Sequence, residues 1–107
     1  MLEHAEELIE AKYHLAAAII LRAVLEERLR KLCKSNNCMP TKQRPTIENF
    51  KLSLQAATAI DRIGVKDIDG MAGVGNAAAH HLPEYKAEDV PPFYQRVTAF
   101  LVRFSVA

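Results

Sequence analysis

Residues 2–34 read LEHAEELIEAKYHLAAAIILRAVLEERLRKLCK, and this stretch decides the fold class. It contains no proline or glycine, and most of its residues are strong helix formers such as alanine, leucine, glutamate and arginine. Its apolar residues recur every three or four positions from Leu8 to Leu29, which is the spacing of one helical face. We therefore predict one unbroken helix over Leu2 to Lys34, with a length of roughly 50 Å.

A second helix is predicted after two prolines, Pro40 and Pro45, which keep the intervening segment out of a helix. It should begin near Thr46, because threonine is a common residue at helix N-termini, and end at Gly64. Its apolar residues follow helical spacing: Ile47, Phe50, Leu54, Ala57 and Ile60.

The last third of the chain predicts two more helices. One runs from about Asp67 to Leu82, although each glycine inside it costs up to about 1 kcal/mol. The other contains Pro91 and Pro92 in its first turn and has an apolar face from Phe93 to Phe104. The prediction is an all-α fold of four helices in a single domain, residues 1–107. The uncapped end at 104–107 leaves open that this domain belongs to a longer protein.

The glycines of the third segment, Gly70, Gly73 and Gly75, have two interpretations. A phosphate-binding loop would need a preceding strand and a following lysine and hydroxyl residue, and the sequence has neither. The preferred interpretation is that small residues such as Gly75 and Ala78 allow a neighbouring helix to approach closely.

Composition gives broad limits on the class of protein. The 107 residues are 50% hydrophobic and 25% charged, which is an ordinary globular mixture. No apolar run approaches the roughly 20 residues of a membrane span, and the N-terminus is acidic where a signal peptide would be basic. We therefore expect a cytoplasmic protein with no membrane partner, in which Cys33 and Cys38 are free thiols.

The net charge of +1 hides an uneven distribution. Residues 1–27 carry a charge of −4, residues 28–44 carry +6, and residues 45–107 carry −1. The basic stretch is a candidate phosphate-binding segment, and its cations are Arg28, Arg30, Lys31, Lys34, Lys42 and Arg44. It has no aromatic residue for base stacking, so a solvated loop is the favoured interpretation.

Few residues have the spacing of a catalytic or metal-binding site. The histidines and cysteines lack the spacing of a zinc site, so we expect no metal and no cofactor. Arg22 and Glu26 are four residues apart on the first helix and are predicted to form a structural ion pair. His80 and His81 are adjacent, so on a helix they would point about 100° apart and could not face one ligand together.

Two stretches together resemble one family. LRAVLE at 21–26 and GNAAAH at 75–80 are similar to segments of HEPN-type helical domains, in the branch that is found beside bacterial defence and restriction genes. The resemblance covers roughly residues 5–105. It implies a four-helix up-and-down bundle that forms a homodimer, with the Asn–His segments of two subunits meeting in a cleft.

Active members of this superfamily are metal-independent ribonucleases, and the resemblance assigns tentative catalytic roles to Asn76 and His80. Their motif also has an arginine directly before the asparagine, where this chain has Gly75. Positive charge near the reacting phosphate is usually a large part of such catalysis. The leading hypothesis is therefore a non-catalytic binding or dimerisation module, associated with RNA in a defence or toxin–antitoxin system. The alternatives are an endoribonuclease using His80 with an arginine from elsewhere, such as Arg22 or Arg62, and a plain helical interaction module.

Overall fold

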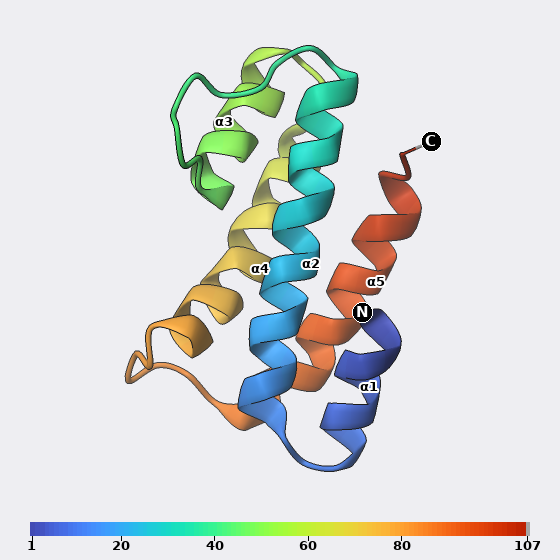
Figure 1. Cartoon of the computed structure of the whole chain (residues 1–107), viewed down its shortest axis with the longest axis vertical. Coiled ribbons are helices and arrows are strands. Elements are labelled where there is room, and N and C mark those ends of the chain that lie inside the picture. The colour runs from blue at the N-terminus through green and yellow to red at the C-terminus, as the bar shows by residue number, and fades with distance from the viewer. Residues whose placement is uncertain (107) are drawn as a thin grey trace.

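A computed structural model describes residues 1–106 and is helical, with no strand in that part of the chain (Figure 1). It contains five α-helices and one short 3-10 helix: α1 (Leu2–Glu10), α2 (His14–Ser35), α3 (Ile47–Ala56), α4 (Arg62–Ala79), η1 (Ala87–Asp89) and α5 (Val90–Arg103). The all-α prediction is confirmed, and the count of four helices is wrong. The C-terminal segment 104–107 was predicted to lack a helix cap, and its last residue, Ala107, lies outside the described residues.

The long first helix is the main error, because the chain turns at residues 11–13. Lys12 adopts a left-handed conformation with φ 69°, and the Tyr13 amide donates to the Leu8 carbonyl at 2.7 Å. These features form a Schellman motif, which ends a helix by satisfying its last carbonyls. α1 then folds back against α2 and buries Ala5. Two helices, α1 and the 22-residue α2, therefore replace the single predicted helix of 33 residues.

Three other helices end in the same way, at Asn37, Thr58 and His81, which have φ values of 53°, 55° and 51°. Glycine is the usual residue at this position, so the sequence gives little warning of these ends. The second predicted helix consequently stops at Ala56 and not at Gly64. Gly64 lies instead in the first turn of α4, where its amide donates to the capping carboxylate of Asp61 at 2.7 Å. The predicted start of this helix at Asp67 is five residues late.

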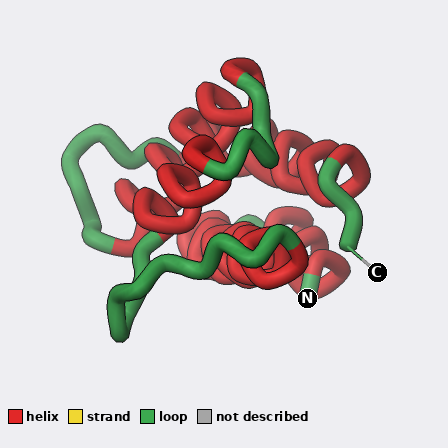
Figure 2. The backbone as a smooth tube through the Cα atoms, turned by 90° about the horizontal axis from the view of Figure 1, so that it is seen from above, coloured by secondary structure: helices red, strands yellow, loops and turns green. Residues whose placement is uncertain are grey.

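α2 runs through the middle of the molecule and contacts each of the other four α-helices (Figure 1). α3 and α4 lie to one side of it and α1 and α5 to the other; Figure 2 shows the same arrangement from above. The core fills the space between them with fully buried side chains, the largest of which are Phe50, Phe93, Phe100, Leu21, Leu25 and Leu29. Within the described residues, none of the helices is long and apolar enough to cross a membrane.

The loop 36–46 determines where α3 begins. It runs back along the molecule, so that α3 starts beside the middle of α2 and follows the direction of α2 (Figure 1). The Cys33 thiol donates to the Phe50 carbonyl at 3.6 Å, and the Arg30 guanidinium lies 5.1 Å from the centre of the Phe50 ring. These contacts fix the register of α3 against α2 and bring the N-terminus of α3 next to Arg22.

Candidate functional site

A pocket of about 240 Å³ lies where α2, α4 and the N-terminus of α3 meet. We call it the Arg22 pocket, and its lining residues are Arg22, Thr46, Ile47, Glu48, Ala72, Asn76 and His80. It brings together the two sequence stretches that carry the family resemblance, because Arg22 comes from the first stretch and Asn76 and His80 come from the second.

Arg22 and Asn76 are in direct contact across 54 positions of sequence. The Nε atom of Arg22 donates to Oδ1 of Asn76 at 3.0 Å. The contact needs a small residue beside Asn76, because a Cβ atom on Gly75 would lie only 3.1 Å from Cβ and Cγ of Arg22. The predicted role of Gly75, close approach of a neighbouring helix, is thus confirmed, and the neighbour is α2.

One acidic residue, Glu26, moderates the charge of Arg22. Its Nη1 atom lies 3.7 Å from Glu26 Oε2, at the predicted i, i+4 spacing, and both side chains are about 29% exposed. The other carboxylate oxygen of Glu26 lies 3.5 Å from Arg30, so one carboxylate serves two guanidinium groups. At this exposure such pairs contribute little to stability, but they limit how the Arg22 side chain can turn.

The N-terminus of α3 adds hydrogen-bond donors to the pocket. Thr46 and Asn49 form a capping box, in which the Thr46 hydroxyl accepts from the Asn49 amide at 3.2 Å. This cap leaves the amides of Ile47 and Glu48 without an intrahelical acceptor, and both residues line the pocket. Glu48 is itself paired with Lys51 at 3.0 Å, which offsets its negative charge. The partial positive charge of a helix N-terminus favours an anion here.

The two adjacent histidines separate at the end of α4. His80 is the C-cap residue, is exposed, and donates its backbone amide to the Asn76 carbonyl at 3.0 Å. His81 lies beyond the helix with φ 51°, so the expected 100° separation on a helix does not apply to the pair. Only His80 of the two lines the Arg22 pocket.

The six cations of residues 28–44 do not share one surface. Nη1 of Arg28 donates to the carbonyls of Leu101 and Phe104 at 2.7 and 3.0 Å, where it caps the end of α5. Arg30 is held by glutamates and by the Phe50 ring. The other four are exposed: Lys31, Lys34, Lys42 and Arg44. Of these, Lys31 and Lys34 line a hollow toward the end of α5 together with Arg28, and Arg44 lies two residues before Thr46.

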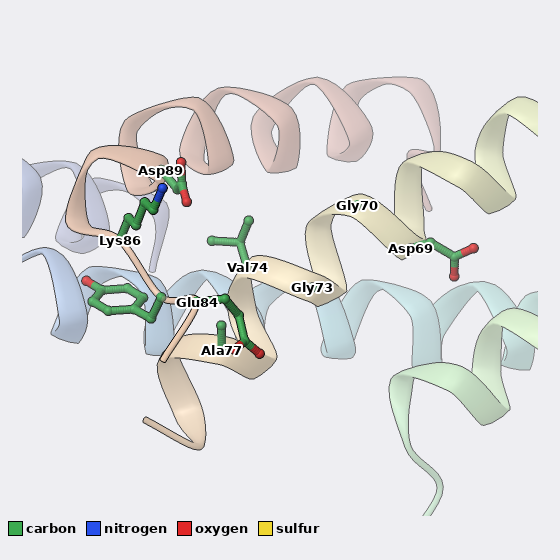
Figure 3. A pocket seen from close by; sticks show the side chains of 9 residues that line it. Asp69, Gly70, Gly73, Val74, Ala77, Glu84, Lys86 and Asp89 are labelled. Atoms are coloured by element: carbon green, nitrogen blue, oxygen red, sulfur yellow. The ribbon is translucent and has the colours of Figure 1, made fainter. Parts of the chain in front are cut away.

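A larger hollow of about 420 Å³, the glycine groove, lies on another face of α4 (Figure 3). Gly70, Gly73 and Ala77 form its floor, and the segment 84–89 forms one wall. Asp69 lies at the opposite end from Lys86 and Asp89 in Figure 3. Its charged groups come mainly from exposed segments, so we place the candidate site at the Arg22 pocket, where side chains from two helices are held by a hydrogen bond.

Part of the site could not be found in the sequence. Thr46 and Glu48 reach the pocket only because the loop 36–46 turns back, and no motif marks them as partners of Arg22.

Among the described residues, no group of three or more histidine, cysteine, aspartate or glutamate side chains is arranged to hold a metal ion. Comparisons of the chain with protein-family models, with curated proteins and with solved structures find no match.

Proposed function

We propose that this chain is a HEPN-like module that binds phosphate groups of RNA in the Arg22 pocket and does not cleave the RNA. The observation that supports the proposal best is the 3.0 Å hydrogen bond between Arg22 and Asn76 in a pocket that also contains the N-terminus of α3. The side-chain oxygen of Asn76 accepts the hydrogen bond from Arg22, so the side-chain amide nitrogen of Asn76 is a further donor for a bound anion. Guanidinium and amide donors that converge in this way are suited to phosphate oxygens.

Two features favour binding over cleavage. The guanidinium of Arg22 is shared with Glu26, so less of its charge is available to stabilise a phosphorane-like transition state. His80 is exposed at the end of a helix, whereas preorganised catalytic charges act most strongly in sites that exclude water. A non-catalytic module of a bacterial defence or toxin–antitoxin system is the role that the resemblance adds to this proposal.

A second candidate is a metal-independent endoribonuclease with His80 as general acid or base. The observation that favours it is that Arg22 lines the same pocket as His80, so α2 supplies the cation that the sequence around Asn76 lacks. In this case Arg22 would stabilise the phosphate and Asn76 would orient Arg22. The two candidates differ in whether bound RNA stays intact.

The test measures binding and cleavage with the same RNA. A labelled single-stranded RNA is titrated with wild-type protein, with Arg22→Met and with the control Arg62→Met, at two salt concentrations and with EDTA present. Arg62 is exposed at the other end of α4, roughly 20 Å along the helix from Asn76, and its substitution removes the same charge. Loss of a charge-assisted contact worth about 1.5–3 kcal/mol weakens binding about tenfold or more.

We expect Arg22→Met to weaken binding and to reduce its salt dependence, because one phosphate contact is lost, while Arg62→Met behaves like the wild type. Equal effects of the two substitutions would reject the Arg22 pocket as the binding site. If the RNA is cut in EDTA, and His80→Ala abolishes the cutting, the endoribonuclease is correct and the binding module is not.

We also propose that the module is a homodimer, as the resemblance implies. Two exposed apolar side chains flank the pocket in sequence: Ile19 lies three residues before Arg22, and Leu82 lies two residues after His80. Sedimentation equilibrium should give the mass of two chains for the wild type and of one chain for an Ile19→Glu, Leu82→Glu variant; a monomeric wild type would contradict this part.

A further inference from the structure

The turn that ends α2 brings Cys33 and Cys38 together. The Cys38 amide donates to the Cys33 carbonyl at 2.9 Å, the Asn37 amide donates to Lys34 at 3.2 Å, and Asn37 has φ 53°. These are the bonds of a Schellman motif whose first and sixth residues are the two cysteines. Side chains at these two positions commonly contact each other.

The hydrogen bond also limits the distance between the two Cα atoms. Standard backbone lengths added to the 2.9 Å bond allow a Cα–Cα separation of at most roughly 6.8 Å. Disulfides span Cα–Cα separations of about 4.4–6.8 Å. A disulfide can therefore form here with little movement of the backbone, although both cysteines are free thiols in this structure.

The two thiols differ strongly in exposure. Cys33 is fully buried and donates its thiol to the Phe50 carbonyl, whereas Cys38 is partly exposed. Burial, with a smaller effect of the neighbouring Cys38, raises the pKa of Cys33 from 9.0 to about 12. Because the thiolate is the reacting form, an oxidant from solution meets Cys38 first.

We propose that Cys33 and Cys38 are a reversible modification site that closes to an intramolecular disulfide by exchange with a low-molecular-weight disulfide such as oxidised glutathione. The Cys38 thiolate attacks the glutathione disulfide, which forms a mixed disulfide and releases one glutathione thiolate. Cys33 then loses its proton to solvent and attacks the Cys38 sulfur, which forms the protein disulfide and releases the second glutathione. The two protein thiols are oxidised and one glutathione disulfide is reduced.

This proposal is independent of RNA binding, because neither cysteine lines the Arg22 pocket. It is tested on the folded full chain, equilibrated in buffers with different ratios of reduced to oxidised glutathione. Samples are quenched in acid, alkylated and weighed by mass spectrometry. The variants are Cys33→Ser, whose hydroxyl can still donate to Phe50, and Cys38→Ser.

In oxidising buffer we expect the wild type to lose the mass of two hydrogens, to resist alkylation at both positions and to carry no glutathione. Cys33→Ser should accumulate a glutathione adduct on Cys38, because the second step is missing. Cys38→Ser should stay unmodified, because Cys33 is buried. A wild type that retains the glutathione adduct, links two chains together, or closes the disulfide only in urea would overturn the proposal. If Cys33→Ser does not fold by circular dichroism, the wild type and Cys38→Ser still decide the question.

Discussion

Substitution of two glycines in α4 by alanine tests whether α2 and α4 must approach closely at the candidate site. A Cβ atom on Gly73 would meet nothing within 4 Å, whereas one on Gly75 would lie 3.1 Å from Cβ and Cγ of Arg22. Both substitutions add the same group to the interior of the same helix. The comparison therefore separates the helix propensity of alanine from the contact with α2.

The two expected effects have opposite signs. Alanine in place of glycine inside a helix contributes up to about 1 kcal/mol, so Gly73→Ala should raise the free energy of unfolding by up to that amount. In a domain of this size about 1 kcal/mol corresponds to a rise in Tm of about 4–8 °C. Gly75→Ala has the same gain, but overpacking against α2 costs about 1–3 kcal/mol. We expect Gly75→Ala to be less stable than Gly73→Ala by about 1–3 kcal/mol.

The assay is urea unfolding followed by far-UV circular dichroism, together with the RNA titration. Gly75→Ala should also weaken RNA binding, because the stem of Arg22 must move away from α4 and the hydrogen bond to Asn76 lengthens. Gly73→Ala should leave binding unchanged. If Gly75→Ala is as stable as Gly73→Ala and binds RNA equally well, then the close approach of the two helices does not hold Arg22 in place, and the reasoning fails.

Three further predictions concern the scaffold. Lys51→Met should lower the free energy of unfolding by about 1–2 kcal/mol at neutral pH, as measured with urea, because Lys51 joins α3 to Asp69 of α4 at 2.7 Å. The pKa of Lys51 is raised in the folded state, chiefly by its hydrogen bond to Asp69. This stabilisation is therefore full below the pKa of lysine in the unfolded chain, about 10.4, and is lost as the pH rises through the folded-state pKa. An equal loss of unfolding free energy at alkaline pH in wild type and variant would contradict this prediction. Arg28→Met should cost about 1–2 kcal/mol through lost hydrogen bonds to the last carbonyls of α5, and unchanged urea unfolding would show that this cap does not stabilise the fold. Thr58→Gly should raise Tm, because a β-branched residue is strained at φ 55° and glycine is not; a lower Tm would mean that the strain is negligible.

The sequence predicted the fold class because helix propensity and apolar spacing are local properties. The last helix was also placed well, since Pro91 and Pro92 fit only a first turn, and α5 begins at Val90. Helix ends were predicted poorly. Four of them depend on residues other than glycine in a left-handed conformation, which is stabilised by hydrogen bonds and packing around the turn.

The candidate site was predicted only in part, for the same reason. Sequence patterns identified Arg22, Asn76 and His80 as separate features, and Arg22 was only one of several arginines that could replace the one missing before Asn76. The tertiary structure brings Arg22 to Asn76, because antiparallel packing of α4 on α2 places the two side chains within hydrogen-bond distance. It also gives the six cations of residues 28–44 different surroundings: Arg28 donates to carbonyls at the end of α5, whereas Lys31 and Lys34, which line the same hollow, are exposed.

The sequence by itself determined that this chain is helical and where its last helix begins. Only the tertiary structure decided that α1 and α2 are two helices, that the N-terminus of α3 lines a pocket with Arg22, and that Cys33 and Cys38 share one turn. The physical reason is that propensity and periodicity act over a few residues. A pocket built from α2, α3 and α4 depends on how a loop turns and on where a glycine lets two helices meet.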